Sequence, residues 1–225
     1  MPRTNAKVRR EAGRRRRLAP AHRRALIMEA AARVFADRGY SGAAMTDIAA
    51  AAGISPSVIY DHFPSKRDLH LALLDQHGQA LIEATFQEAS AALTADASSE
   101  ELARSGTDAF FRFVEQDRYA WRMLFRDPPA DDEIAATHAR IHGEGAACIA
   151  AMIRQAPLLN LPAGIPRDRA EEMMAWAIKS SNDRLAVWWY EHPELPRKQV
   201  VEIALGLWWR GLAAAMEQGP DRNMT

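Results

Sequence analysis

The spacing of apolar residues from Leu26 onward predicts an all-α protein. In the first segment they recur at i, i+4, i+7 and i+8, the pattern of one buried helix face, at Ile27, Ala31, Val34 and Phe35. Similar patterns predict further helices over residues 66–93, 101–125, 133–154, 169–190 and 197–217. Polar or proline-containing stretches typical of loops separate them. No stretch alternates as a strand would, and there is no internal repeat.

Residues 46–66 predict two short helices joined by a tight turn, with a third helix starting directly after them. Gly53 stands where the first helix must end, because glycine enters the left-handed region without steric cost. Ser55 is expected to cap the second helix with its side chain, and Pro56 suits that helix's first position. Ser65, three residues before Asp68, is expected to cap the third helix. The second helix also has polar groups off its apolar face, as in a helix-turn-helix that enters the DNA major groove.

Residues 23–74 resemble the DNA-binding domain of the tetracycline-repressor (TetR) family of bacterial transcription regulators. The matching residues are Ile27, Ala30, Ala31, Phe35, Gly39, Tyr40, Ile48, Ala49, Ala52, Gly53, Ile54, Ser55, Tyr60, Phe63, Lys66 and Leu69. The resemblance implies a three-helix DNA-binding domain followed by a helical effector-binding and dimerisation domain. We therefore expect a basic disordered arm over 1–22, a helix-turn-helix domain over 23–65, the helical domain over 66–218 and a disordered tail over 219–225.

The chain departs from this family where the second helix of the domain begins. Ala43 and Ala44 stand where the family usually has Thr or Ser, and losing a hydroxyl cap costs about 1 kcal/mol. Asp61 also brings a negative charge toward the DNA backbone. These departures leave open a second hypothesis, a helical ligand-binding or enzymatic protein whose helix-turn-helix is vestigial.

The expected DNA contacts come from the two short helices and the start of the third. They are Thr46, Ser55, Pro56, Ser57, Val58, Tyr60, Asp61, His62 and Lys66. Val58 is suited to a thymine methyl group, and Asp61 to a cytosine amino group. Tyr60, His62 and Lys66 are expected to contact phosphates.

Charge is divided unevenly along the chain, although the 29 Lys and Arg residues balance the 29 Asp and Glu residues. Residues 1–24 contain ten Lys and Arg and a single Glu, which leaves the remainder at net −9. We expect Arg14, Arg15, Arg16 and Arg17 to neutralise phosphates and follow the minor groove. The alternative is a solubilising tail or a cloning remnant.

Composition favours a cytoplasmic protein. The single cysteine, Cys148, excludes an internal disulfide framework. No apolar run approaches the ~20 residues of a membrane helix, and no signal-peptide apolar region follows the basic N-terminus.

The last two predicted helices are rich in small and aromatic residues. Trp208 and Trp209 point about 100° apart on a helix, so we expect one to face the core and the other a partner. Gly206 and Ala213, two turns apart, would admit a second helix. The alternative is the core edge of a monomer. The family resemblance implies a homodimer through these helices, with two recognition helices on a palindromic double-stranded operator.

The middle helices are then expected to enclose a pocket for a small-molecule effector. Its candidate residues are Phe110, Phe113, Trp121, Arg122, Phe125, His142, Met152, Trp176 and Ser180. They favour an apolar or aromatic effector, with Arg122 or a histidine available to an anionic head. His138 and His142 have a spacing that can hold zinc, but no third ligand is specified. No catalytic residue, metal or cofactor is predicted, and we expect apolar neighbours to make Cys148 inert by raising its pKa.

Overall fold

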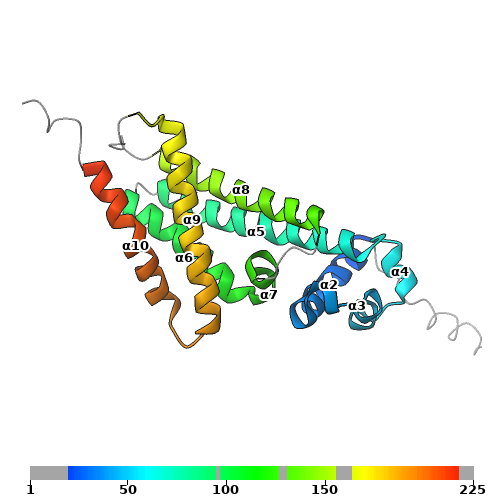
Figure 1. Cartoon of the computed structure of the whole chain (residues 1–225). Coiled ribbons are helices and arrows are strands. Elements are labelled where there is room, and N and C mark those ends of the chain that lie inside the picture. The colour runs from blue at the N-terminus through cyan, green and yellow to red at the C-terminus, as the bar shows by residue number, and fades with distance from the viewer. Residues whose placement is uncertain (1–19, 95–96, 127–130, 156–163, 218–225) are drawn as a thin grey trace, which may run out of the picture.

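The computed structural model describes residues 20–94, 97–126, 131–155 and 164–217, and those residues form helices and connecting turns without a strand. The N-terminal unit, called the head below, comprises α2 (Pro20–Gly42), α3 (Met45–Ala52) and α4 (Pro56–Tyr60). Figure 1 shows the head at one end of an elongated molecule. Helical structure therefore begins at Pro20, inside the segment assigned to the arm.

The rest of the described chain, called the body, is a helical bundle. Its elements are α5 (Lys66–Thr94), α6 (Ser99–Gln116), α7 (Arg118–Trp121), the π-helical turn η1 (Arg122–Arg126), α8 (Asp132–Arg154), α9 (Arg167–Glu191) and α10 (Arg197–Glu217). The long helix α5 begins beside the head and continues between α6 and α8 (Figure 1). Among the described helices, none is both long and apolar enough to span a bilayer.

One predicted helix is divided in the structure. Residues 101–125 were expected to be continuous, but α6 ends at Asp117, whose backbone leaves the helical region (φ −121, ψ 68). The Asp117 carboxylate accepts a hydrogen bond from the Ala120 N–H at 2.9 Å, so the same residue starts α7. Asp117 also pairs with His77 of α5 at 3.3 Å. An aspartate that can satisfy the first N–H groups of a new turn favours a break over continuation.

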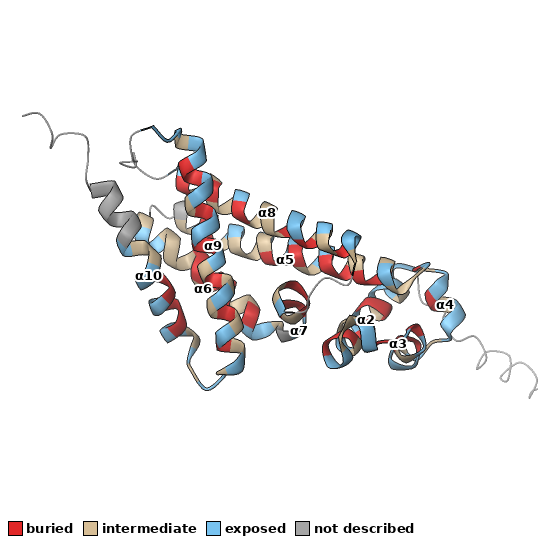
Figure 2. Cartoon of the chain, viewed as in Figure 1, coloured by how far each residue is buried: buried red, intermediate tan, exposed pale blue. Residues whose placement is uncertain are grey.

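The head and the body share one hydrophobic core. In the head it is formed by residues such as Phe35, Ile48 and Ile59, and it continues through α5 to Phe111 and Trp121, all completely buried. Figure 2 shows the buried faces of the helices turned toward one another along this line. Because no solvent layer separates the two units, a shift of α5 or η1 must move side chains in both.

Candidate DNA-binding head and effector cavity

The turn between α3 and α4 has the predicted geometry. Gly53 lies in the left-handed region (φ 66, ψ 30) and ends α3. Its N–H donates to the Ala50 carbonyl at 3.2 Å, and the Ile54 N–H donates to the Ala49 carbonyl at 3.0 Å. These bonds satisfy carbonyls that the end of α3 would leave without partners. The turn sets the direction of α4 relative to α3, and the fully buried Ile59 packs α4 against the core of the head.

The helix caps of the head only partly follow the prediction. Ser55 precedes α4, but its hydroxyl bonds the Ser57 hydroxyl at 2.9 Å and caps no N–H, so the predicted side-chain cap was wrong. Pro56 does occupy the first position of α4. As expected, no hydroxyl caps α3, and the Ala44 N–H donates instead to Asp47 at 3.3 Å. Asp47 is held in turn by Arg38 at 2.7 Å.

The solvent-facing side of α3 and α4 presents most of the residues predicted to contact DNA. Those classed as exposed are Thr46, Ser55, Pro56, Ser57, Tyr60 and Asp61, and Val58 and His62 are partly exposed. Tyr60 is 53% exposed, so its ring and hydroxyl are available to a partner. The predicted arginines of the arm lie outside the described residues.

Lys66, predicted to contact a phosphate, has intramolecular partners. Its ammonium donates to the carbonyl oxygens of Tyr40 at 2.8 Å and Ala43 at 2.9 Å, and it lies 4.6 Å from the centre of the Tyr40 ring. Lys66 thus links the start of α5 to the end of α2 and the residues that follow it. Its contact with DNA stays a prediction, but this structural role was not foreseen. As predicted, Ser65 caps α5, accepting from the Asp68 N–H at 3.1 Å.

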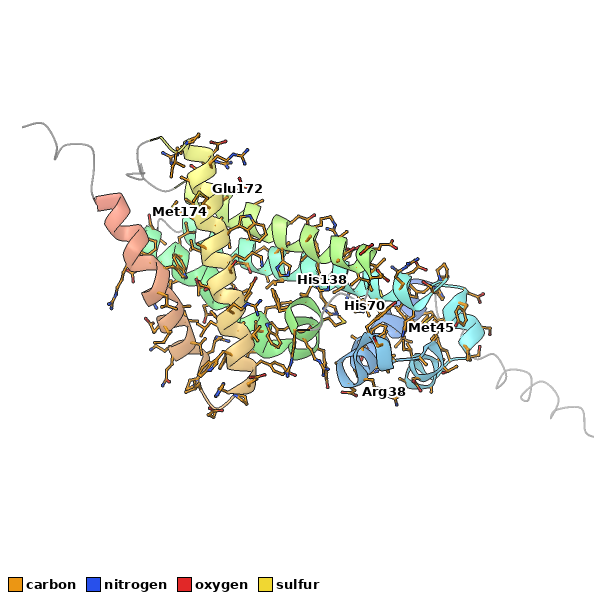
Figure 3. The ribbon with its side chains drawn as sticks, in the orientation of Figure 1. Arg38, Met45, His70, His138, Glu172 and Met174 are labelled. Carbon is orange, nitrogen blue, oxygen red and sulfur yellow. The ribbon has the colours of Figure 1, made fainter. Side chains whose placement is uncertain are left out.

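The joint between head and body is buried and aromatic. His70 of α5 packs edge-on against Phe35, with ring centres 5.0 Å apart, and lies 4.8 Å from the Tyr40 ring. Burial, assisted by the nearby His138, lowers the pKa of His70 to about 4, so its imidazole is neutral. Figure 3 shows both histidines where α5 and α8 run toward the head. A second link comes from η1, where the Arg122 guanidinium donates to the Ala36 carbonyl of α2.

The body encloses a cavity of about 180 Å³ between α5, α6, η1, α8, α9 and α10. Four of the nine predicted effector residues line it, namely Phe110, Phe125, His142 and Met152. Most of the remaining lining is also apolar, including Leu81, Ile82, Ile141 and Ile149. The walls therefore match the apolar effector site expected from the sequence.

The other five candidates do not line this cavity. Phe113 borders a separate groove between α5 and α6. Trp121 is fully buried and stacks on Tyr190 at 4.5 Å, and Arg122 reaches the head. Trp176 and Ser180 lie four residues apart on the exposed side of α9. A helix presents different faces to its neighbour and to solvent, and the face that turns inward depends on packing.

The inward face of α9 contains two charged residues, Lys179 and Asp183, that were not among the candidates. Lys179, Asn182 and Asp183 line the cavity at the i, i+3, i+4 spacing that puts them on one face. The only signal in the sequence was this spacing, which puts the three residues on one face of α9 without showing where that face turns. Trp208 and Trp209 of α10 also both line the cavity, with ring centres 6.1 Å apart, whereas only one of them was expected to point inward.

These polar residues form a compact cluster. The Lys179 ammonium lies 2.5 Å from an Asp183 oxygen and 2.6 Å from Nδ1 of His142. Burial and the Lys179 charge lower the pKa of His142 to about 4, whereas burial raises the pKa of Asp183. Burial also raises the pKa of the Cys148 thiol, as expected from its apolar neighbours. In the part of the chain that the structure describes, no three His, Cys, Asp or Glu side chains are grouped to hold a metal.

The side of α9 and α10 away from the cavity, called the outer face, is apolar and exposed. It includes Met173 and Trp176 of α9 and Ile203 and Leu207 of α10, with Leu207 67% exposed. A Cβ added to Gly206 would meet no atom within 4 Å, so that position is also open. Figure 2 shows exposed residues alternating with buried ones along α9 and the described part of α10. An exposed apolar patch can mark an interaction surface.

A short helix presented to solvent by a tight turn, with a helical body behind it, is the architecture of helix-turn-helix transcription regulators. Residues 27–73 match the family model of bacterial regulatory proteins of the tetR family. The HTH-type transcriptional activator FasR of Mycolicibacterium smegmatis is 31% identical over 197 residues, which cover 88% of this chain and 86% of FasR. The chain belongs to the TetR family of DNA-binding transcription regulators.

Solved structures share the whole fold. A TetR-like transcriptional regulator from Rhodococcus sp. RHA1 is 25% identical with a TM-score of 0.70, over 88% of this chain and 99% of that one. The fatty acid degradation regulator FadR from Bacillus halodurans is 17% identical with a TM-score of 0.65, over 80% and 97%. At 17% identity, the similarity to FadR shows a shared fold and nothing about function.

Proposed function

We propose that this protein is a homodimeric repressor that binds a palindromic operator and releases it when an apolar small molecule enters the cavity. The observation on which the proposal rests is the double connection between cavity and head. On α5, Leu81 and Ile82 line the cavity, while Lys66 and His70 of the same helix hold the head. On η1, Phe125 lines the cavity three residues from Arg122, which binds the Ala36 carbonyl.

An effector can change DNA affinity only by its preference for one of two conformations. A ligand that displaces Phe125 would move η1 and with it the Arg122 contact to α2. Typical coupling free energies of 1–3 kcal/mol correspond to roughly 5–150-fold in affinity. We therefore expect release within that range, with the same fold-change in ligand affinity when DNA is bound.

The outer face supports a dimer. Leu207 and Ile203 expose more than half of their surface on α10, next to the open position Gly206. Pairing this surface with its copy would bury it and place two heads side by side, as a palindromic site requires. Gly206→Arg tests the surface, because a Cβ added at this position meets no described atom within 4 Å. Light scattering should report monomers or aggregates, with Ser180→Ala as a matched exposed control, and a persistent dimer would place the interface elsewhere.

Activation is the second candidate, because FasR is named an activator. Both modes use the same head and differ in where the operator lies relative to the promoter. The deciding experiment is a gel shift on the promoter region beside the protein's own gene, followed by a reporter driven by that promoter. Repression predicts higher reporter output when the protein is deleted, and activation predicts lower output.

The same gel shift separates regulation from the vestigial alternative. A functional head should bind specifically, and Tyr60→Ala, which removes an exposed side chain of α4, should weaken binding. Thermal-shift screening should then find apolar compounds that stabilise the fold, by about 2.7 kcal/mol at a hundredfold excess over their dissociation constant. Those compounds should also lower DNA affinity. A protein that binds them and ignores DNA would support the vestigial head.

A further inference from the structure

The polar wall of the cavity contains buried hydrogen-bonding atoms without a partner. Among the described residues, the side-chain oxygen of Asn182, Oδ1 of Asp183 and Nε1 of Trp208 are buried without a hydrogen bond to the protein. All three residues line the cavity, and Asn182 is only 7% exposed. A buried polar group without a partner raises the free energy of the empty protein, so a ligand that supplies the partner gains affinity. Two of the three atoms accept hydrogen bonds and one donates.

The charges of this wall argue against an anionic ligand. Lys179 is the only Lys or Arg among the described lining residues, and its ammonium is already bound to Asp183 and His142. His142 is neutral at physiological pH because its pKa is lowered to about 4. Arg122, the cation expected from the sequence to meet an anionic head, contacts the Ala36 carbonyl instead. A carboxylate would also meet the Asp183 oxygen, a like charge in a poorly solvated site.

The interior volume of the cavity indicates the size of the group that it can surround. Its volume of about 180 Å³ lies below the ~300–1,000 Å³ of sites for drug-sized molecules. It is close to the ~150 Å³ of an engineered apolar cavity that binds benzene. A single aromatic ring with a short substituent therefore matches the space, and Phe110, Phe125 and Met152 supply apolar walls for it.

We propose that the cavity binds an uncharged, single-ring apolar molecule with a hydroxyl group, held by donation to Asn182 or Asp183 and by acceptance from the Trp208 indole. A phenolic hydroxyl has both capacities. The Trp208 N–H and one of the two acceptor oxygens would then be satisfied by one group, while the ring replaces empty space with contacts. The inference rests on the proposed function only in taking this molecule as an effector, since binding itself requires no DNA.

The test uses three matched probes, para-propylphenol, para-propylanisole and para-propylbenzoate, titrated calorimetrically into the full chain without DNA. They share the ring and the propyl group and differ in being a donor, an acceptor without a donor, or an anion. The phenol should bind at least tenfold more tightly than either other probe. Equal binding of phenol and anisole would show that the donor is not recognised. Tighter binding of the benzoate, or no binding of any probe at its solubility limit, would also overturn the inference.

Two variants test the contacts. Asn182→Leu removes an acceptor at similar volume, and Trp208→Phe removes the indole donor while keeping an aromatic ring. Asn182→Leu should weaken the phenol at least threefold and leave the anisole within twofold. Trp208→Phe should weaken the phenol at least threefold and the anisole too, because both oxygens can accept from the indole. Ser180→Ala on the exposed side of α9 should change neither. If Asn182→Leu does not fold, Trp208→Phe decides alone. Unchanged phenol affinity in the folded variants would contradict the assignment.

A gel shift with each probe separates the two claims. Phenol-selective binding without loss of DNA affinity would keep the ligand class and contradict the proposed release. Release of DNA by all three probes alike would support an effector-regulated protein and contradict the proposed ligand class.

Discussion

The head and the cavity place polar side chains in opposite environments. In the head, Ser57, Tyr60 and Asp61 face solvent, and short-range caps and one lysine hold the backbone beneath them. In the cavity, Asn182 and Asp183 are enclosed by helices that come from positions far apart in the chain. A partner that binds exposed groups must bring its own charge and shape, whereas one that binds enclosed groups must satisfy them and fit. The first condition suits a large polyanion, and the second suits a small, mostly apolar molecule.

The largest predicted effect concerns pH. His70, where α5 packs against the head, and His142, in the cavity, both have a lowered pKa. Histidine normally has a pKa near 6.5, and His70 at the joint has one of about 4. Between these values the unfolded chain binds a proton that the folded chain does not, so stability falls as pH falls through this range. His70 should account for about 3 kcal/mol of lost unfolding free energy between pH 7 and pH 4.

Urea denaturation of wild type and His70→Leu at several pH values checks this prediction. The variant should remove most of that loss, since leucine has no proton to gain and Nδ1 of His70 has no partner among the described residues. His142→Leu should remove less, because the His142 side chain is 27% exposed and water can solvate its charged form. A pH dependence that His70→Leu leaves intact would mean that the joint is more hydrated than its packing implies.

The second prediction concerns the attachment of the head to α5. Lys66→Met keeps the aliphatic stem and removes the ammonium that binds the carbonyls of Tyr40 and Ala43. Hydrogen bonds from a charged donor contribute about 1.5–3 kcal/mol, so the head should lose about 2 kcal/mol of stability. Hydrogen exchange should show the loss at α2 and α3 and not at α8. Unchanged exchange with a DNA salt slope lower by about 1 would instead assign Lys66 to a phosphate.

The same contrast explains which features could be predicted from the sequence. The Gly53 turn and the Ser65 cap depend on residues within four positions, and both are confirmed. The cap expected from Ser55 failed because a serine side chain has several rotamers, and here it turns to Ser57. Helix bounds were also close, apart from the break at Asp117.

The lining of the cavity was predictable only in part. Phe110, Phe125, His142 and Met152 do line the cavity, because aromatic and Met side chains in middle helices face a core more often than solvent, and their contact with an effector stays a prediction. Trp176 was misplaced for the same reason, since the outer face also has aromatic side chains. Choosing between the two faces of α9 required knowing which helices pack against it. The spacing of Lys179, Asn182 and Asp183 defines a face but not its direction.

The third prediction tests whether the head binds DNA without the basic arm. Deleting residues 1–19 removes eight Lys and Arg residues and leaves every described helix intact, because α2 begins at Pro20. We expect at least a tenfold loss of DNA affinity at low salt and a shallower salt dependence, since fewer counterions are released. Urea midpoints should stay the same. If the full chain and the deletion variant bind DNA equally at every salt concentration, the head makes all phosphate contacts and residues 1–19 do not take part in binding.

The smallest predicted effect compares two serines that each directly precede a helix, Ser98 before α6 in the body and Ser55 before α4 in the head. Ser98 caps α6 in the body: its hydroxyl accepts from the Glu101 N–H at 3.3 Å, and the Glu101 carboxylate accepts from the Ser98 N–H at 2.7 Å. Ser98→Ala should therefore cost about 1 kcal/mol in urea denaturation. Ser55 precedes α4 but caps no N–H, so Ser55→Ala should cost less than about 0.5 kcal/mol.

Binding should show the reverse order, because Ser55 is exposed on the proposed DNA surface and Ser98 lies on a body helix. Ser55→Ala should weaken operator binding severalfold in a gel shift, while Ser98→Ala should leave it unchanged. If Ser55→Ala instead costs as much stability as Ser98→Ala, its hydroxyl caps α4 in solution. The serine would then stabilise the head, and α4 would need other side chains to contact the operator.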